Sequence, residues 1–366
     1  IHKSKMLVLE AFNIIAAGDP KQALDMLNHA RDINKDDVFN AIFTAQATFN
    51  QGNDAETERQ FTALLKAEET RFLGYRGLVL LKTRQGNLDQ AHYFLQQALR
   101  ERPDSPWVLG QLFNWNVEHL SFSGAETILE QLRIGGYLSK SETRRKKAVL
   151  LWVKAEHDLK KNDFEGFYEA VLEALKLAPE LTNATLALVN YYGESNRQSK
   201  AWKCLKKGYG VNPHPDFLNG LKQLFPQKNS LELYQQGQEL TIEQRQHPTT
   251  QWLLAKLAIE AKLWGQARTH LSALHKIQPI QAYFELMADL EKQENPGNIE
   301  EIQKLYSQAA RAPRGSVWVC QSCHVVLPKW EAFCPHCHSF DLITWAEEEK
   351  IKQSQAHIAI PMGSKF

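Results

Sequence analysis

The stretch Gly86-Asn87-Leu88-Asp89-Gln90-Ala91, which runs on to Pro103, decides the fold, because parts of it return along the chain at a fixed interval. Gly18, Gly52 and Gly86 are each 34 residues apart, and Asp or Asn follows every one of them. Self-similarity at a fixed interval of roughly 20 to 50 residues is typical of stacked repeats, in which each copy is one supersecondary unit. The chain of 366 residues is therefore predicted to be a repeat array rather than one compact core.

Three rows of small or apolar residues keep the 34-residue step through four copies. Within each copy the rows are four and then three residues apart, which places them on one face of an α-helix. A small residue in the first row lets two helices approach closely, and a large apolar residue one turn later fills the space between neighbouring pairs. The rows are Ala23, Thr57, Ala91 and Ala125; Leu27, Phe61, Leu95 and Leu129; and Ala30, Leu64, Ala98 and Leu132.

The residues between these helices are typical of tight turns. Each glycine can end the preceding helix in a left-handed conformation without a steric clash from a Cβ atom. Asp19 precedes Pro20, which suits an N-cap followed by proline at the first helical position. The pattern therefore predicts paired helices joined by short turns.

These residues resemble the tetratricopeptide repeat. The resemblance implies an all-α fold, in which antiparallel helix pairs stack into a right-handed superhelix and strands are nearly absent. We expect this solenoid over residues 1–312, with a break in the repeat phase near 135–145 and an irregular segment, helical in two pieces, over 215–246. Later copies continue the pattern at Phe167, Val171 and Ala174; at Ala201, Leu205 and Gly208; and at Ala267, Leu271 and Leu274.

A solenoid of this kind presents a long concave surface that can hold a peptide or a partner helix. Polar residues on the first helix of each pair are the candidates for partner binding, because they can hydrogen-bond an extended peptide backbone. The alternative interpretation is that these residues belong to solvated helix faces. The candidates from the repeat phase are Arg76, Arg84, Asn114, Glu156 and Asn190.

Four of the five cysteines lie near the C-terminus, as the pairs Cys320/Cys323 and Cys334/Cys337 with ten residues between the pairs. Two residues between cysteines suit a knuckle that points both sulfurs at one metal ion, and two knuckles give a closed tetrahedral shell. The sequence therefore predicts a small ribbon over 313–346, followed by a tail over 347–366. Short strands are expected at 316–319, 325–327 and 341–345, with an apolar jacket of Trp318, Trp330, Phe333, Phe340 and Trp345.

Zinc is the favoured ion, because closed thiolate sites in reduced compartments are usually structural zinc sites. Iron in the same geometry, as a redox centre, is the alternative. His324, His336 and His338 are spare candidates, but four sulfurs already complete the shell. In rubredoxin-like knuckles a glycine often follows the second cysteine, and here His324 and His338 stand in that place.

Charge and missing motifs exclude several functions. Lys and Arg number 43 against 42 Asp and Glu, which argues against a nucleic-acid partner bound through a generally basic surface. The basic run Arg144-Arg145-Lys146-Lys147 is expected to be a solvated helix face. The chain contains no nucleotide-binding or hydrolase motif, and four thiolates leave no open metal position, so we expect no enzyme. It also contains no apolar run long enough for a membrane span and no secretory signal.

Two late stretches resemble the bacterial HemY family. They are residues 246–267, with His247-Pro248, Trp252 and Trp264-Gly265-Gln266-Ala267, and residues 312–345, with Trp318, the four cysteines and Phe340-Asp341. The resemblance implies a non-catalytic scaffold at the cytoplasmic face of the bacterial inner membrane, held by an anchor upstream of Ile1. It also implies haem-biosynthesis enzymes as partners.

The LapB family, tetratricopeptide proteins with a similar C-terminal metal ribbon, is a second resemblance. It implies an adaptor that regulates lipopolysaccharide synthesis through a membrane protease, with the ribbon packed against the repeats. An iron-binding protein that handles haem or electrons is a further alternative.

Overall fold

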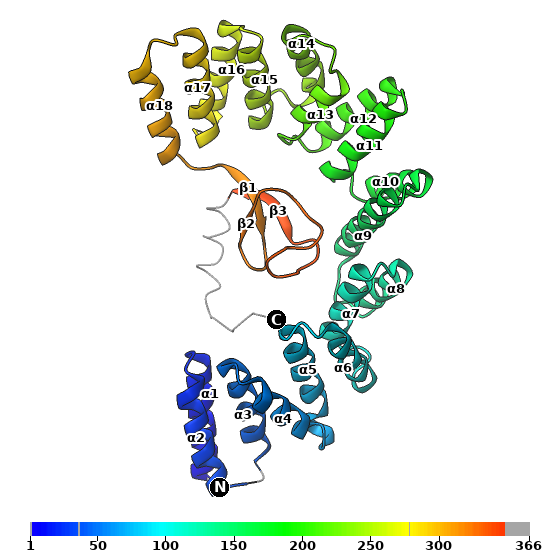
Figure 1. Ribbon diagram of the computed structural model, residues 1–366, viewed down its shortest axis with the longest axis vertical. Helices are drawn as coiled ribbons and strands as arrows, with labels where there is room; N and C mark the ends of the chain where they lie inside the picture. Colours follow the sequence, from blue (N-terminus) through cyan, green and yellow to red (C-terminus); the bar gives the residue numbers. More distant parts are fainter. Residues whose placement is uncertain (1, 36, 278, 348–366) are drawn as a thin grey trace. The chain divides into compact units, whose positions relative to one another are not determined.

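A computed structural model describes residues 2–35, 37–277 and 279–347. The described residues form two compact units, one within residues 1–140 and one from residue 141 onward, and each is considered by itself below. In both units the helices follow one another as antiparallel pairs (Figure 1). Up to residue 311 all the described secondary-structure elements are helices, which confirms the all-α repeat fold.

The N-terminal unit contains four helix pairs within its described residues. Their bounds are α1 (His2–Ala16), α2 (Pro20–Ile33), α3 (Val38–Gln51), α4 (Asp54–Leu64), α5 (Glu68–Arg84), α6 (Leu88–Glu101), α7 (Pro106–Glu118) and α8 (Phe122–Ile134).

The C-terminal unit continues the array and ends in a small sheet. Its helices are α9 (Lys140–Lys160), α10 (Phe164–Leu177), α11 (Thr182–Glu194), α12 (Gln198–Val211), α13 (Phe217–Leu224), α14 (Ser230–Leu240), the 3₁₀ turn η1 (Ile242–Gln244), α15 (Pro248–Glu260), α16 (Trp264–Ile277), α17 (Gln281–Glu294) and α18 (Ile299–Arg311). The segment expected to be irregular, 215–246, contains α13, α14 and η1, and Asn229 and Glu232 close a capping box at the start of α14.

The three repeat rows form the buried face of each second helix. All twelve residues of the rows in the N-terminal unit are buried, from Ala23 and Leu27 of α2 to Leu132 of α8. The later copies continue in the same way, with Phe167, Ala201 and Ala267 all buried. The 34-residue spacing therefore identifies the core correctly in both units.

Two kinds of turn join the helices of a pair. Gly18, Gly52 and Gly86 have φ of +88°, +81° and +72°, and the side chains of the following Asp19, Asn53 and Asn87 each accept a hydrogen bond from the first turn of the next helix. A second kind of turn reaches the left-handed region without glycine. It uses Leu120, Asn162, Asn196 and Lys262, with φ between 55° and 60°.

The C-terminal sheet has the order β2-β1-β3, with both pairings antiparallel. Its strands are β1 (Ser316–Cys320), β2 (Val326–Leu327) and β3 (Ile343–Glu347), close to the three that the sequence predicts. In the register, Trp318 of β1 lies opposite both Leu327 and Trp345. The predicted tail begins at Glu347, the last residue of β3, and the rest of it lies outside the described residues. No helix in the described ranges combines the length and apolar character needed to cross a bilayer.

Two glycines within helices of the N-terminal unit give a matched test of the packing. A Cβ atom at Gly77 of α5 would lie 2.2 Å from the ring of Phe61, whereas one at Gly110 of α7 would meet nothing within 4 Å. We expect Gly77→Ala to lower the free energy of unfolding by about 1–3 kcal/mol because it overpacks a buried contact. Gly110→Ala should raise it by about 0.5–1 kcal/mol through helix propensity. Chemical denaturation measures both, and equal effects of the two variants would contradict the helix packing described here.

Candidate metal centre

The two cysteine pairs meet at one point at the end of the sheet. The four sulfurs of Cys320, Cys323, Cys334 and Cys337 all lie within 4.8 Å of one another, and none forms a disulfide. Cys320 Sγ lies 3.6 Å from Cys337 Sγ, and Cys323 Sγ lies 3.6 Å from Cys334 Sγ. A tetrahedral ion with sulfur ligands about 2.3 Å away places the sulfurs about 3.8 Å apart. The four predicted ligands therefore come together with the spacing that a metal ion requires.

The two knuckles have the same backbone. In each knuckle the backbone N–H of the first cysteine donates to the carbonyl oxygen five residues later. Cys320 N donates to Val325 O at 3.1 Å, and Cys334 N donates to Ser339 O at 3.0 Å. His324 and His338 follow the second cysteine of each pair and adopt φ of 62° and 55°. These are the positions where glycine is often found, and the left-handed conformation costs a non-glycine residue about 1–2 kcal/mol. The knuckle thus forms without glycine, at the cost of backbone strain.

The thiols differ in how readily they ionise. Burial disfavours ionisation of Cys337, but hydrogen bonds from the Ser339 hydroxyl and backbone outweigh this effect and lower the pKa of Cys337 to about 6. Burial, together with the neighbouring thiols, raises the pKa of Cys323 to about 12. Cys337 therefore ionises more readily than Cys323, and a bound cation would favour the thiolate form of its ligands.

The spare histidines stay outside the sulfur cluster. His324, His336 and His338 are exposed, and the group of potential ligands found among the described residues consists of the four cysteines alone. The closed shell leaves no position for a reacting water, so the arrangement suits a structural ion.

An ion pair fixes the ribbon to the repeats of its own unit. The side chain of Asp341, only 6% exposed, accepts hydrogen bonds from Arg145 of α9 at 3.1 to 3.2 Å. Arg145 also donates to Glu180 at 2.7 Å, and Lys146 donates to the carbonyl oxygen of Phe340 at 3.3 Å. The basic run in α9 was predicted to be a solvated face. That prediction is wrong for Arg145 and Lys146, because these residues bind the ribbon.

The charges of this contact are mutually dependent. Burial raises the pKa of the Asp341 carboxyl, and the nearby Arg145 and Lys146 partly offset that effect. Burial alone would lower the pKa of Arg145, but the carboxylates of Asp341 and Glu180 outweigh it and leave the pKa above its ordinary value. Loss of either partner would therefore leave a charge that water reaches poorly.

A buried histidine completes the docking surface. His214, in the loop between α12 and α13, is 1% exposed, and its ring lies 5.1 Å from Trp318 and 4.5 Å from Trp345, measured between ring centroids. Its Nδ1 lies 3.2 Å from Asp216 N and 3.3 Å from the Asp216 carboxylate, and its Nε2 is buried without a hydrogen-bond partner. The rings of His214 and Trp345 meet edge to face, with an angle of 66° between their planes.

The predicted aromatic jacket divides into two parts. Trp330 and Phe340 are buried, and Phe340 packs against Phe333 within the ribbon. Trp318 and Trp345 pack instead against each other and against His214 of the repeats. The jacket therefore also serves as an interface, which the sequence did not reveal because His214 is distant from the ribbon along the chain.

The candidate groove residues lie in different surroundings. In the N-terminal unit, the Arg76 guanidinium lies over the ring of Trp107 at 5.1 Å, Arg84 bonds Phe49 O and Asp54 between repeats, and Asn114 is half-buried on α7. In the C-terminal unit, burial raises the pKa of Glu156, which interacts with Lys329 and Glu331 of the ribbon, while Asn190 is exposed on α11. Their role in partner binding stays a prediction.

Comparison with known proteins relates only part of the chain to a curated protein. No protein-family model matches it. A probable magnetosome protein, Mms48 of Magnetospirillum gryphiswaldense, is 30% identical over 108 residues, which are 30% of this chain and 24% of that protein. The chain thus spans about a quarter of that relative's length.

Solved structures with similarity to the chain include a tetratricopeptide repeat protein and MamA. A tetratricopeptide repeat protein from Parabacteroides merdae is 12% identical, covers 85% of this chain and all of its own, and has a TM-score of 0.38. The crystal structure of MamA is 17% identical, covers 43% of this chain and 92% of its own, and has a TM-score of 0.29.

The ion pair that docks the ribbon can be tested against its neighbour in sequence. Arg145→Gln should weaken docking by about 2–3 kcal/mol, less than the loss for a fully buried pair because the Arg145 side chain is 31% exposed. Arg144→Gln is the matched control, since Arg144 bonds only to Leu177 O in the contacts described. Hydrogen exchange of β1 and β3 measures docking. Unchanged exchange in the Arg145 variant would show that the ion pair is not the anchor.

The strained knuckles predict stabilising substitutions. Because His338 has φ of 55°, His338→Gly should remove the strain and raise the stability of the metal-loaded ribbon by about 0.5–1 kcal/mol. His336→Gly, at an exposed position of the same knuckle with ordinary backbone, should lower it by a similar amount. Competition with a chelator compares the two variants, and a gain from the control as well would rule out strain relief as the cause.

Proposed function

We propose that this chain is a non-catalytic scaffold or adaptor that binds protein partners through its repeats. The stacked helix pairs carry the proposal. Within each unit the pairs pack on one another and present a preformed surface, so a partner binds without first ordering the scaffold. The ribbon acts as a clamp on the repeats of its own unit through Arg145 and His214.

The ion that we assign to the ribbon is zinc. Four thiolates in a closed shell are the usual structural zinc site, and the spacing of the sulfurs fits its geometry. Zinc would neutralise the clustered thiolates and hold the two knuckles together, which a ribbon of this size requires to fold. Iron in the same cage is the alternative, and it would make the ribbon a redox or haem-handling centre.

The partners that we propose are enzymes of late haem biosynthesis at the cytoplasmic face of the bacterial inner membrane. The support is the resemblance of residues 246–267 and 312–345 to the HemY family, which also implies a membrane anchor outside this sequence. The LapB-like alternative is an adaptor for a membrane protease that controls lipopolysaccharide synthesis. A C-terminal ribbon belongs to both resemblances, whereas its packing against the repeats is an implication of the LapB resemblance alone.

Metal content tests the ribbon assignment. Protein purified without added metal should contain about one zinc per chain and show no visible absorption band. The double variant Cys320→Ser with Cys334→Ser should lose the metal and keep most of its helical circular dichroism, because most helices lie outside the ribbon. Cys204→Ser, in α12, is the control and should keep the metal. An iron stoichiometry near one, or metal retained in the double variant, would overturn the assignment.

Partner capture tests the scaffold assignment. Cross-linking of the membrane-anchored full-length protein in its own cell, followed by quantitative mass spectrometry, should enrich haem-biosynthesis enzymes over unrelated membrane proteins. Enrichment of a membrane protease and lipopolysaccharide enzymes would favour the adaptor alternative. Turnover of a substrate by the purified chain alone would defeat both.

A further inference from the structure

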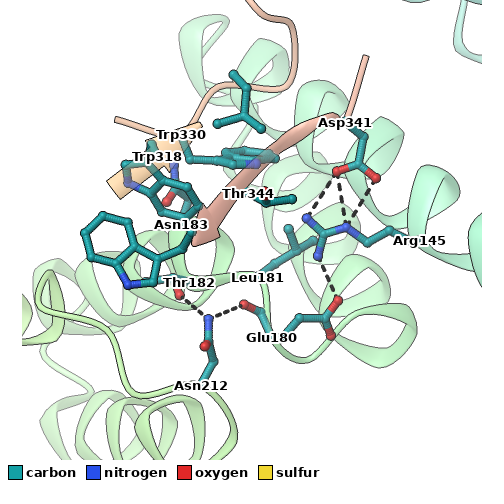
Figure 2. Close-up of a pocket in the computed structure, with 12 residues that line it drawn as sticks. Arg145, Glu180, Leu181, Thr182, Asn183, Asn212, Trp318, Trp330, Asp341 and Thr344 are labelled. Carbon is teal, nitrogen blue, oxygen red and sulfur yellow. Dashed lines mark hydrogen bonds and ion pairs between the residues drawn. The ribbon is translucent and has the colours of Figure 1, made fainter. Parts of the chain in front are cut away.

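A cavity of about 350 Å³ lies where the ribbon meets the repeats of the C-terminal unit (Figure 2). One wall is the ribbon, with Trp318, Trp330 and β3. The other wall is the start of α11 with the end of α12. The cavity belongs to neither the sulfur cluster nor the candidate groove residues, so neither the metal nor the groove accounts for it.

The ribbon wall offers the open edge of a sheet. Three consecutive residues of β3, Ile343 to Trp345, line the cavity. Side chains of successive strand residues point to opposite faces of a sheet, so a cavity on one face alone would not be lined by the side chains of all three. The cavity therefore reaches the side of the strand itself. Among the described strands, β3 pairs only with β1, so its other edge carries backbone groups that can pair with an added strand.

The helix wall offers side-chain and backbone groups suited to a peptide. Asn212 donates through Nδ2 to Glu180 O and Thr182 Oγ1, both at 3.1 Å, and this holds its amide at the cavity (Figure 2). The N-cap of α11, Leu181, has no side-chain hydrogen bond to the first turn, so N–H groups there can donate to a carbonyl oxygen. Thr344 also lines the cavity, and its Oγ1 is buried without a hydrogen-bond partner.

The charges and aromatic rings favour a cation over an anion. The charged residues of the lining are Arg145, Glu180 and Asp341, and the arginine already binds both carboxylates. Lys146 beside Asp341 and the partial positive charge at the start of α11 balance the second carboxylate, so the attraction for a cation comes from Glu180 and the aromatic rings. Trp345 is 37% exposed beside Trp318, and an indole face attracts the ammonium or guanidinium group of a side chain.

We propose that this cavity binds an extended segment of a partner protein, which pairs with the free edge of β3 and places a lysine or arginine side chain against Trp345 near Glu180. This inference rests on the scaffold function proposed above and names the class of segment that the scaffold recognises. The peptide backbone is held by β3 on one side and by Asn183, Asn212 and the start of α11 on the other. The ribbon is then part of a recognition site as well as a clamp.

Synthetic peptides test the inference on the metal-loaded full chain. The probes are acetylated and amidated heptapeptides of alternating threonine and serine with arginine at the centre, with glutamate at the centre, or with the central arginine flanked by N-methylated residues. Calorimetric titration should show the arginine peptide binding at least tenfold more tightly than the glutamate peptide. N-methylation should remove most binding, because it blocks strand pairing. Equal binding of the arginine and glutamate peptides would overturn the proposal.

Variants locate the binding to this cavity. Trp345→Ala should weaken the arginine peptide at least fivefold, and Glu180→Gln should reduce its preference over the glutamate peptide. Asn183→Ala gives a test that leaves the ribbon sequence unchanged, and Asn190→Ala, exposed on the same helix, is the control that should leave affinity unchanged. Metal content confirms that each ribbon is intact. Unchanged affinity in both the Trp345 and Asn183 variants would overturn the cavity as the site.

The same variants separate this inference from the scaffold function. If the wild-type chain captures partners and the Asn183 variant captures them equally well, the scaffold stands and the cavity proposal fails. If the wild-type chain captures no partner, the scaffold proposal itself fails, whatever the peptides do.

Discussion

A single helix pair of this protein cannot bury its own apolar face, and the whole structure follows from that constraint. The rows that begin at Ala23 and Leu27 pack against Val8 and Ala11 of the same pair and against Ala47 of the next pair. This stacking fixes the order and spacing of the helices in each unit. In the C-terminal unit it brings Arg145 of α9, Glu180 before α11 and His214 after α12 within reach of one small ribbon.

The ribbon depends on the repeats as much as on its metal site. Its sheet has three short strands, and two of its tryptophans, Trp318 and Trp345, pack on His214 rather than inside the ribbon. The buried carboxylate of Asp341 is tolerated because Arg145 supplies both charge and hydrogen bonds. The metal site and the contacts with the repeats thus both restrain the ribbon. We infer that loss of the metal weakens docking and that loss of docking weakens metal binding.

The docked ribbon lies near a candidate partner-binding residue of the C-terminal unit. Glu156, which the repeat phase marks as a candidate for partner binding, interacts with ribbon residues Lys329 and Glu331. A protein bound at Glu156 would therefore also meet the ribbon. The cavity lined by Trp318 and Asn183 is likewise built from both ribbon and repeats.

The sequence alone determined the helix pairs, their buried rows and the four cysteines, because each depends on spacing along the chain. A 34-residue step and a two-residue gap between cysteines are local patterns, and local backbone geometry turns them into structure. Only the tertiary structure decided the role of Arg145, Lys146 and His214, whose partners lie more than 100 residues away. No local pattern encodes such a contact, since it arises where the stacking of the repeats meets the fold of the ribbon. His324 and His338 combine both kinds of evidence. The sequence identified them as positions where glycine is often found, and the structure showed that histidine adopts the left-handed conformation there.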